Sequence, residues 1–170
     1  MNLDDIEVPE GLNPALRALG WMVGRWEGTG NGQDHEGNDF EFEQRIEFSH
    51  NGGDYLYYAS QTFKLGEEGA EQVPLGMETG FWRPKADATI EVFLASADGW
   101  AEALTGRIQV TRIDLMTQQG TVVRTNAAAV GYNAGTRLYG QVEGDLMYAL
   151  DRETDDHEMR PHMWARLKRV

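Results

Sequence analysis

Residues 24–30 read Gly24-Arg25-Trp26-Glu27-Gly28-Thr29-Gly30, and this stretch decides the fold. The glycines Gly24, Gly28 and Gly30 allow a first strand to turn away from the segment before it and to approach a neighbouring backbone closely. Trp26 is large enough to fill one end of a barrel. We therefore interpret the stretch as a structural motif, and we expect the indole of Trp26 to stack on the guanidinium of Arg166 near the end of the chain.

A short helix is predicted directly before this motif. Asn13 is a good capping residue, Pro14 suits the first helical position, and Gly24 is expected to end the helix. Residues 1–11 are polar and are interpreted as a flexible lead-in. A single domain is therefore expected to span residues 12–170.

The remainder of the chain alternates apolar and polar residues in short stretches, which is typical of antiparallel strands joined by hairpins. The expected strands are Arg25–Gly30, Phe40–His50, Tyr55–Leu65, Met77–Arg83, Thr89–Ser96, Trp100–Val110, Ile113–Gln118, Thr121–Ala128, Thr136–Val142, Leu146–Leu150 and Met159–Arg169. A sheet of this size hides all its edges only by closing on itself. The sequence thus predicts an all-β fold, a closed antiparallel β-barrel of about ten strands with a short N-terminal helix. Such a barrel is similar to lipocalins and fatty-acid-binding proteins, and its interior is wide enough for a ligand.

Composition excludes several classes of function. The formal net charge is −13, which repels phosphates and anionic headgroups, so we expect no nucleic acid and no membrane as a partner. The chain has no cysteine, which excludes disulfides and thiolate chemistry. Its acidic N-terminus does not resemble a secretory signal, and we expect a cytoplasmic protein.

Alternation along the segment Glu78–Pro84 places Glu78, Gly80 and Trp82 on one face of a strand. Gly80 would leave room there for a flat ligand or for another backbone. A packed strand without any ligand is an equally good interpretation of these residues.

The C-terminal segment Arg160–Val170 contains the most informative histidine. If Arg166 faces the interior, strict alternation also directs His162 and Trp164 inward. A neutral imidazole at that place could ligate a haem iron while its second nitrogen is oriented by a carbonyl group. From the residues alone, a surface or hydrogen-bonded histidine is the stronger alternative. The acidic stretch Asp151–Glu158 is interpreted as a solvated loop.

Four stretches taken together resemble the nitrobindin family. They are Gly24–Gly30, Glu78–Pro84, Leu138–Tyr148 and Pro161–Leu167. The resemblance implies a ten-stranded barrel that holds one ferric haem b per chain in an exposed cleft, with His162 as the axial ligand of the iron. We expect Gly76, Gly80 and Trp164 beside the haem. The resemblance also implies that the protein binds nitric oxide and isomerises peroxynitrite to nitrate.

The chain departs from the family pattern at four places, one of which is the stretch Asp151–Glu158, more acidic here than is usual. Asp34-His35-Glu36 stands where Tyr-Pro-Thr is common, Gly76 replaces a frequent distal histidine, and Ala128 replaces a lysine. Because haem carries two propionates, the loss of a cation is expected to weaken haem binding. The alternative function is a non-catalytic carrier of a hydrophobic small molecule such as a fatty acid, with its carboxylate held by Arg166. Under either hypothesis the partner is a small molecule, and the chain is expected to be a monomer or a homodimer.

Overall fold

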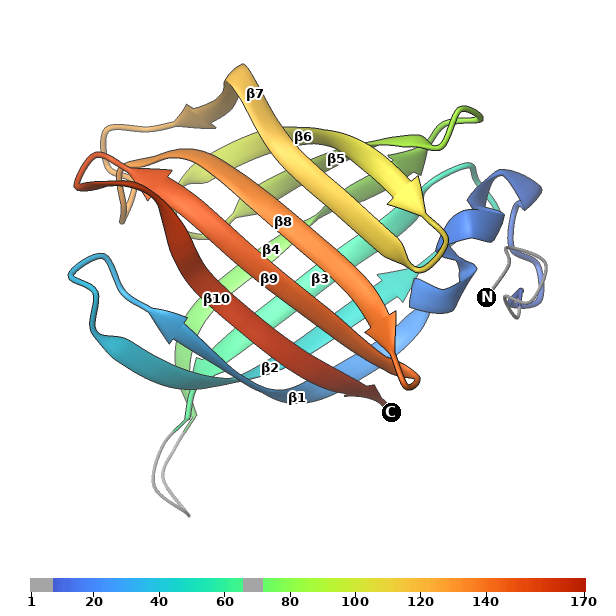
Figure 1. Cartoon of the computed structure of the whole chain (residues 1–170), viewed down its shortest axis with the longest axis horizontal. Helices are drawn as coiled ribbons and strands as arrows, with labels where there is room; N and C mark the ends of the chain where they lie inside the picture. Colours follow the sequence, from blue (N-terminus) through green and yellow to red (C-terminus); the bar gives the residue numbers. More distant parts are fainter. Residues whose placement is uncertain (1–7, 66–71) are drawn as a thin grey trace.

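The computed structural model describes residues 8–65 and 72–170, so most of the expected lead-in lies outside the described residues. Ten antiparallel strands form a closed barrel in which each strand pairs with its neighbours in sequence (Figure 1). The strands are β1 (Gly24–Gln33), β2 (Asp39–Ser49), β3 (Leu56–Lys64), β4 (Val73–Pro84), β5 (Thr89–Ser96), β6 (Trp100–Gln109), β7 (Arg112–Arg124), β8 (Tyr132–Val142), β9 (Asp145–Thr154) and β10 (His157–Arg169). The predicted fold class is confirmed. Within the described part of the chain, no helix is both long enough and apolar enough to cross a membrane.

Two stretches of the barrel differ from the prediction. One strand, β7, stands where two were expected, at Ile113–Gln118 and Thr121–Ala128. It pairs with β8 only as far as Met116 but with β6 as far as Arg124. The acidic stretch Asp151–Glu158 is not a loop, because β9 runs to Thr154 and β10 begins at His157. The charged residues there belong to a hairpin at the rim of the barrel.

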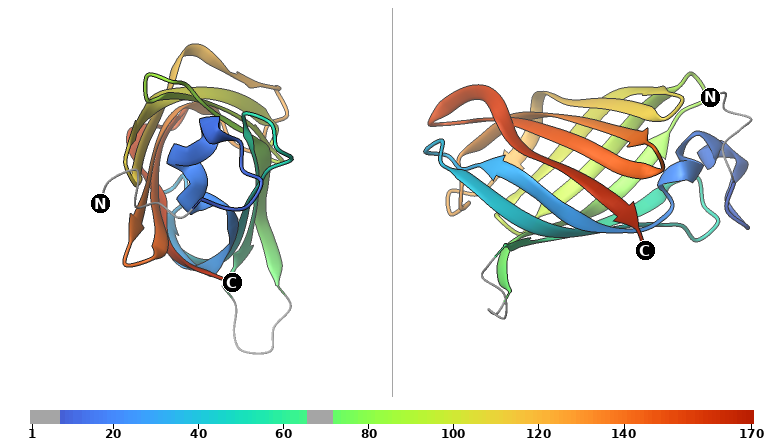
Figure 2. Two further views of the ribbon diagram at one scale, coloured as in Figure 1. Left: turned by 90° about the vertical axis from the view of Figure 1, so that its right-hand side faces the viewer. Right: turned by 60° about the horizontal axis from the view of Figure 1, so that its bottom comes forward.

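A 3₁₀ helix, η2 (Pro14–Met22), covers one end of the barrel (Figure 2). The side chain of Asn13 accepts a hydrogen bond of 3.0 Å from the backbone N–H of Ala15, as expected of a capping residue. Leu16, Leu19 and Met22 are fully buried in the core beneath the helix. The predicted helix is confirmed, in the tighter 3₁₀ form, and it closes this end of the barrel.

The barrel closes where β1 pairs with β10, and this pairing corrects the predicted partner of Trp26. Trp26 lies opposite Arg169 in the ladder, whereas Arg166 lies opposite Thr29. Side chains on alternate residues share a face, so Arg169 joins Trp26 on the inner face and Arg166 points outward. The guanidinium of Arg169 stacks on the indole with its carbon 4.2 Å from the ring centre.

Arg169 and Arg166 accordingly have different roles. Arg169 donates hydrogen bonds to the backbone carbonyls of Trp21 and Val23, which join the last strand to η2. Arg166 instead pairs on the outer surface with Asp145, 2.6 Å away, and with Glu143, 2.8 Å away. The expected stacking on Trp26 is therefore made by the other arginine, and Arg166 cannot hold a carboxylate inside the barrel.

Candidate functional site

The end of the barrel opposite η2 contains a cavity of about 280 Å³. The β1–β2, β5–β6 and β7–β8 connections contribute to its rim, while β2, β3, β4, β6, β8, β9 and β10 form its walls. Apolar side chains in its lining are Phe40, Leu75, Met77, Trp100, Val130, Leu150 and Met163. The remaining lining side chains are mainly polar or charged.

His162 lines this cavity from β10. The ladder between β9 and β10 has an irregularity between Pro161 and Met163. Inward residues of β10 below this bulge are Met163, Ala165 and Leu167, so a regular strand would have turned residue 162 outward. The bulge resets the alternation and directs His162 inward together with Met163.

The imidazole of His162 has a defined tautomer. Its Nδ1 lies 2.9 Å from the backbone carbonyl oxygen of Gln33 in β1, and a carbonyl can only accept, so Nδ1 carries the proton. Burial, assisted by the positive charge of Arg152, lowers the pKa of His162 to about 4. The ring is therefore neutral near pH 7, and Nε2 keeps a free lone pair. No described residue hydrogen-bonds to Nε2.

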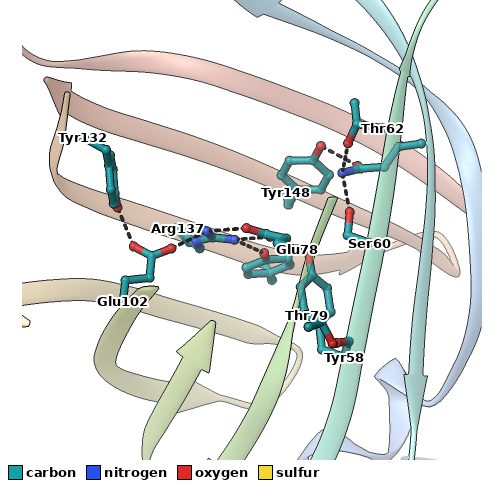
Figure 3. Close-up of polar contacts among 11 residues, drawn as sticks. Tyr58, Ser60, Thr62, Glu78, Thr79, Glu102, Tyr132, Arg137 and Tyr148 are labelled. Carbon is teal, nitrogen blue, oxygen red and sulfur yellow. Dashed lines mark hydrogen bonds and ion pairs between the residues drawn. The ribbon is translucent and has the colours of Figure 1, made fainter. Parts of the chain in front are cut away.

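The floor of the cavity is a buried ion network centred on Arg137 in β8 (Figure 3). Its guanidinium donates to both carboxylate oxygens of Glu78, at 2.6 and 3.0 Å, and to Glu102 at 2.5 Å. Tyr58 donates to Glu78 at 2.8 Å, and Tyr132 donates to Glu102 at 2.5 Å. Two carboxylates thus share one guanidinium, which leaves the floor with a formal charge of −1.

The electrostatics of Glu78 follow from this arrangement. Burial alone would raise the pKa of the Glu78 carboxyl, but the attraction and hydrogen bonds of Arg137 outweigh burial and leave that pKa below its usual value. Tyr132, by contrast, has a pKa raised by burial and by the charge of Glu102. Glu78 is therefore ionised, and Tyr132 keeps its proton and donates it to Glu102 in a hydrogen bond.

A second, neutral group lies on the β2–β3 wall (Figure 3). The amide nitrogen of Gln44 donates to Ser60 at 2.9 Å and to Thr62 at 3.2 Å, and its oxygen accepts from Tyr148 at 2.5 Å. The side chains of Gln44, Ser60 and Thr62 line the cavity while satisfying one another. This wall is consequently polar without being charged.

Two charged side chains near the rim of the cavity have no close partner. Arg152 of β9 and Asp98 of the β5–β6 hairpin line the cavity and are partly buried. The side chain of neither makes a hydrogen bond or ion pair with another described residue. They attract each other across a longer distance, since each alters the pKa of the other.

The predicted site residues divide into two groups. His162 and Gly76 line the cavity, and a Cβ added to Gly76 would meet no atom within 4 Å. Gly80 is buried below the cavity, where a Cβ would overlap the carbonyl oxygen of Phe93, so it serves the close approach of β5. Trp164 is 39% exposed on the outer face. The bulge between Pro161 and Met163 shifts the alternation of side chains, so His162 and Trp164 do not share a face. The expectation that Gly80 and Trp164 lie beside a ligand is therefore wrong.

Sequence analysis missed three charged residues, Glu102, Arg137 and Arg152, and the neutral phenol of Tyr132. A signal for the first was present: Glu102 shares its strand face with Leu104 and Ile108, and a carboxylate at an inward position requires a partner. Arg137 has the same relation to Tyr139 on β8. Arg152 could not be found in this way, since its stretch was interpreted as a loop. No cluster of three or more metal-ligating His, Asp or Glu side chains occurs among the described residues.

Comparison with known proteins gives a consistent result. A family model described as "THAP4-like, heme-binding beta-barrel domain" matches residues 15–169. A "Ferric nitrobindin-like protein" of Cutibacterium acnes is 48% identical, over 96% of this chain and 98% of that protein. A "Peroxynitrite isomerase" of Nocardioides sp. is 35% identical, over 96% of this chain and 98% of that protein. The crystal structure of Rv2717c from M. tuberculosis has a TM-score of 0.84 and 30% identity, and it covers 94% of this chain and 99% of that one.

Proposed function

The chain belongs to the nitrobindin family of haem-binding β-barrels, and from this premise we propose that it binds one ferric haem b through His162 and isomerises peroxynitrite to nitrate. The observation that carries the proposal is the state of the His162 ring. Its Nδ1–H is engaged by the Gln33 carbonyl, and its Nε2 lone pair is free in a cavity. A hydrogen-bonded second nitrogen is the usual arrangement of a metal-ligating histidine, because it fixes the tautomer and the orientation of the ring.

The remaining residues of the cavity agree with a flat, largely apolar ring beside His162. Phe40 lies 6.2 Å from the imidazole, measured between ring centres, and Met163 adjoins it on β10. Both side chains offer apolar contact to a ring that approaches Nε2. Across the barrel, β4 presents Gly76, which leaves open space rather than a side chain on the far side of such a ring.

Ferric haem, when bound, supplies a Lewis-acid iron that can bind nitric oxide and convert peroxynitrite into its isomer nitrate. The chain would contribute a single neutral nitrogen ligand from His162. Gly76 offers a small molecule space and no hydrogen bond. The low pKa of His162 keeps the ligand nitrogen unprotonated through the neutral range.

The charge of the floor disfavours the alternative of a fatty-acid carrier. A carboxylate that reached Arg137 would meet Glu78 and Glu102, which already occupy the guanidinium. Arg166, the arginine expected to hold that carboxylate, lies on the outer surface. Neither arginine is therefore available to the carboxylate of a lipid deep in the barrel.

Titration of the purified apoprotein with hemin tests the proposal. We expect a saturable Soret band with one hemin per chain, and we expect His162→Ala to weaken binding and change the band position. His157→Ala is the matched control, because His157 lies at the β9–β10 hairpin and does not line the cavity. A wild-type protein without a saturable spectral change would end the proposal. Displacement of a fluorescent fatty acid that is insensitive to His162→Ala would support the carrier instead.

A further inference from the structure

We propose that Arg152 is the carboxylate-binding residue of the cavity, and that it orients the bound haem by pairing with one propionate at the rim. This inference rests on the proposed function. The inference concerns the rotational orientation of the haem in the cavity. His162 alone would not fix this orientation, because a ring held at its centre can still rotate.

The first argument is that Arg152 is available. Arg137 and Arg152 are the only arginine or lysine side chains among the described residues that line the cavity. Arg137 is engaged by Glu78 and Glu102, whereas the guanidinium of Arg152 has no hydrogen bond or ion pair with the described residues. A partly buried guanidinium retains five donors that require acceptors, and a carboxylate can accept two of them at once.

The second argument is the position of Arg152 relative to His162. Arg152 lies opposite Arg160 in the β9–β10 ladder, on the rim side of the bulge that directs His162 inward. The charge of Arg152 is close enough to His162 to contribute to the lowered pKa of that ring. A carboxylate on the edge of a flat ligand centred at His162 can therefore reach the guanidinium at the rim.

The third argument is charge. The floor carries a net negative charge from Glu78 and Glu102, which repels an anionic edge of the ligand. The guanidinium at the rim attracts the same edge. Together they favour one orientation, with the apolar edge of the ring inward and the propionates outward. Burial lowers the pKa of Arg152, which shows that its charge is incompletely solvated and would be stabilised by an anionic partner.

Asp98 is the competing group at the rim. Burial raises the pKa of its carboxyl, and the charge of Arg152 partly opposes this effect. Asp98 both attracts the guanidinium and repels a propionate, so it weakens the site. The acidic residues Asp34 and Asp151 also line the cavity and add to the repulsion. Among the lining residues that the structure describes, Arg152 is thus the one cation without a close partner, and the acidic residues there disfavour an anionic ligand.

The test compares two porphyrins on two proteins. Hemin has free propionates, and hemin dimethyl ester has the same ring without their charge. We expect Arg152→Met to weaken hemin binding about tenfold, the scale of one charge-assisted hydrogen-bonded pair at a partly wet site. The ester should bind wild type and variant within about twofold of each other, since it cannot form the ion pair. Arg166→Met is the control, an arginine-to-methionine change on the outer face that should alter neither titration.

The outcomes separate the two proposals. A Soret position that is unchanged in Arg152→Met, together with weaker hemin binding, supports both, because the axial ligand is retained while the ion pair is lost. Equal weakening of hemin binding and of ester binding would mean that Arg152 only packs against the ring. No weakening of either would mean that Arg152 does not contact the ligand. Both results overturn the proposed role of Arg152 and leave His162 as the ligand. If wild type binds neither porphyrin, the proposed function fails and this inference fails with it.

A second variant guards against a folding defect in Arg152→Met. Asp98→Asn removes the competing carboxylate and should tighten hemin binding severalfold while leaving the ester unaffected. Weaker hemin binding by Asp98→Asn would contradict the proposal that Asp98 competes with a propionate for Arg152. Circular dichroism and thermal unfolding of each variant, measured without porphyrin, confirm that the barrel is intact.

Discussion

The Nδ1 of His162 donates a hydrogen bond of 2.9 Å to the carbonyl oxygen of Gln33, the last residue of β1. This contact joins the first strand to the last at the rim of the barrel. The contact involves only atoms of the chain itself, so it would hold the imidazole in one orientation for the proposed coordination. Preorganisation of this kind avoids the cost of ordering the ring when a ligand arrives.

The tautomer and pKa of His162 can be measured directly. We expect ¹⁵N-resolved NMR of the apoprotein to show a protonated Nδ1 and an unprotonated Nε2 from pH 8 down to about pH 5, with protonation near pH 4. His157 at the hairpin provides an internal comparison. A His162 that titrates at the usual histidine value of about 6.5 would show that the ring is solvated rather than enclosed.

The same shift predicts a pH dependence of stability. Because the folded-state pKa is lowered, the unfolded chain takes up a proton between about pH 6.5 and pH 4 that the folded chain does not. The free energy of unfolding should therefore decrease as the pH falls through this window, by an amount of order 1–3 kcal/mol attributable to His162. Urea unfolding of wild type and His162→Asn at pH 7 and pH 5 measures the difference. Equal pH slopes in the two proteins would contradict it.

The ion network of the floor predicts strongly non-additive mutations. Arg137→Met leaves Glu78 and Glu102 buried without their cation and should cost about 3–5 kcal/mol of unfolding free energy. Changing both carboxylates to glutamine in the same protein should recover most of the loss, since no charge is then left unpaired. Urea denaturation of the single and triple variants tests this. A triple variant as unstable as Arg137→Met would refute the explanation.

Arg169 and Arg166 form a matched pair for testing how the barrel closes. Arg169→Met removes the stacking on Trp26 and the hydrogen bonds to the carbonyls of Trp21 and Val23, and it should cost about 1–3 kcal/mol. Arg166→Met removes exposed ion pairs, which contribute about 0–1 kcal/mol. Thermal unfolding should rank the two variants in that order. The reverse order would favour the closing role first assigned to Arg166.

Two glycines of β4 should differ in their tolerance of a methyl group. Gly80→Ala places a Cβ against the backbone carbonyl of Phe93 and should destabilise the barrel by about 1–3 kcal/mol. Gly76→Ala projects into open space and should change stability by less than about 0.5 kcal/mol. Chemical denaturation distinguishes them. Similar losses of stability in the two variants would mean that the overlap with the Phe93 carbonyl does not decide whether alanine is tolerated in β4.

Much of the architecture could be predicted because it depends on short-range patterns. The alternation of β5 gave its bounds, Thr89–Ser96, without error. By contrast, β9 and β10 were predicted too short at the rim, where they carry charged residues that a simple apolar-in pattern assigns to solvent. The cavity is polar at its rim and floor, so the rule that buried residues are apolar fails at the functional end of the barrel.

The candidate site was only partly predictable, because its geometry depends on a bulge. His162 lines the cavity, but the reason given for this position, a shared face with Trp164 and Arg166, is wrong. Regular alternation cannot reveal a bulge between Pro161 and Met163. The pairing of Glu78, Glu102 and Arg137 joins residues from three strands, and such long-range contacts leave no local pattern in the sequence.

The plug formed by η2 has a consequence for kinetics. One mouth is sealed by the buried side chains of Leu16, Leu19 and Met22, so a molecule that enters the described barrel through the hairpin rim also departs through that rim. Uptake and escape then cross the same barrier, so a substitution that merely widens the rim accelerates both by an equal factor and leaves the dissociation constant unaltered. Retention time and affinity can therefore be tuned separately in this barrel.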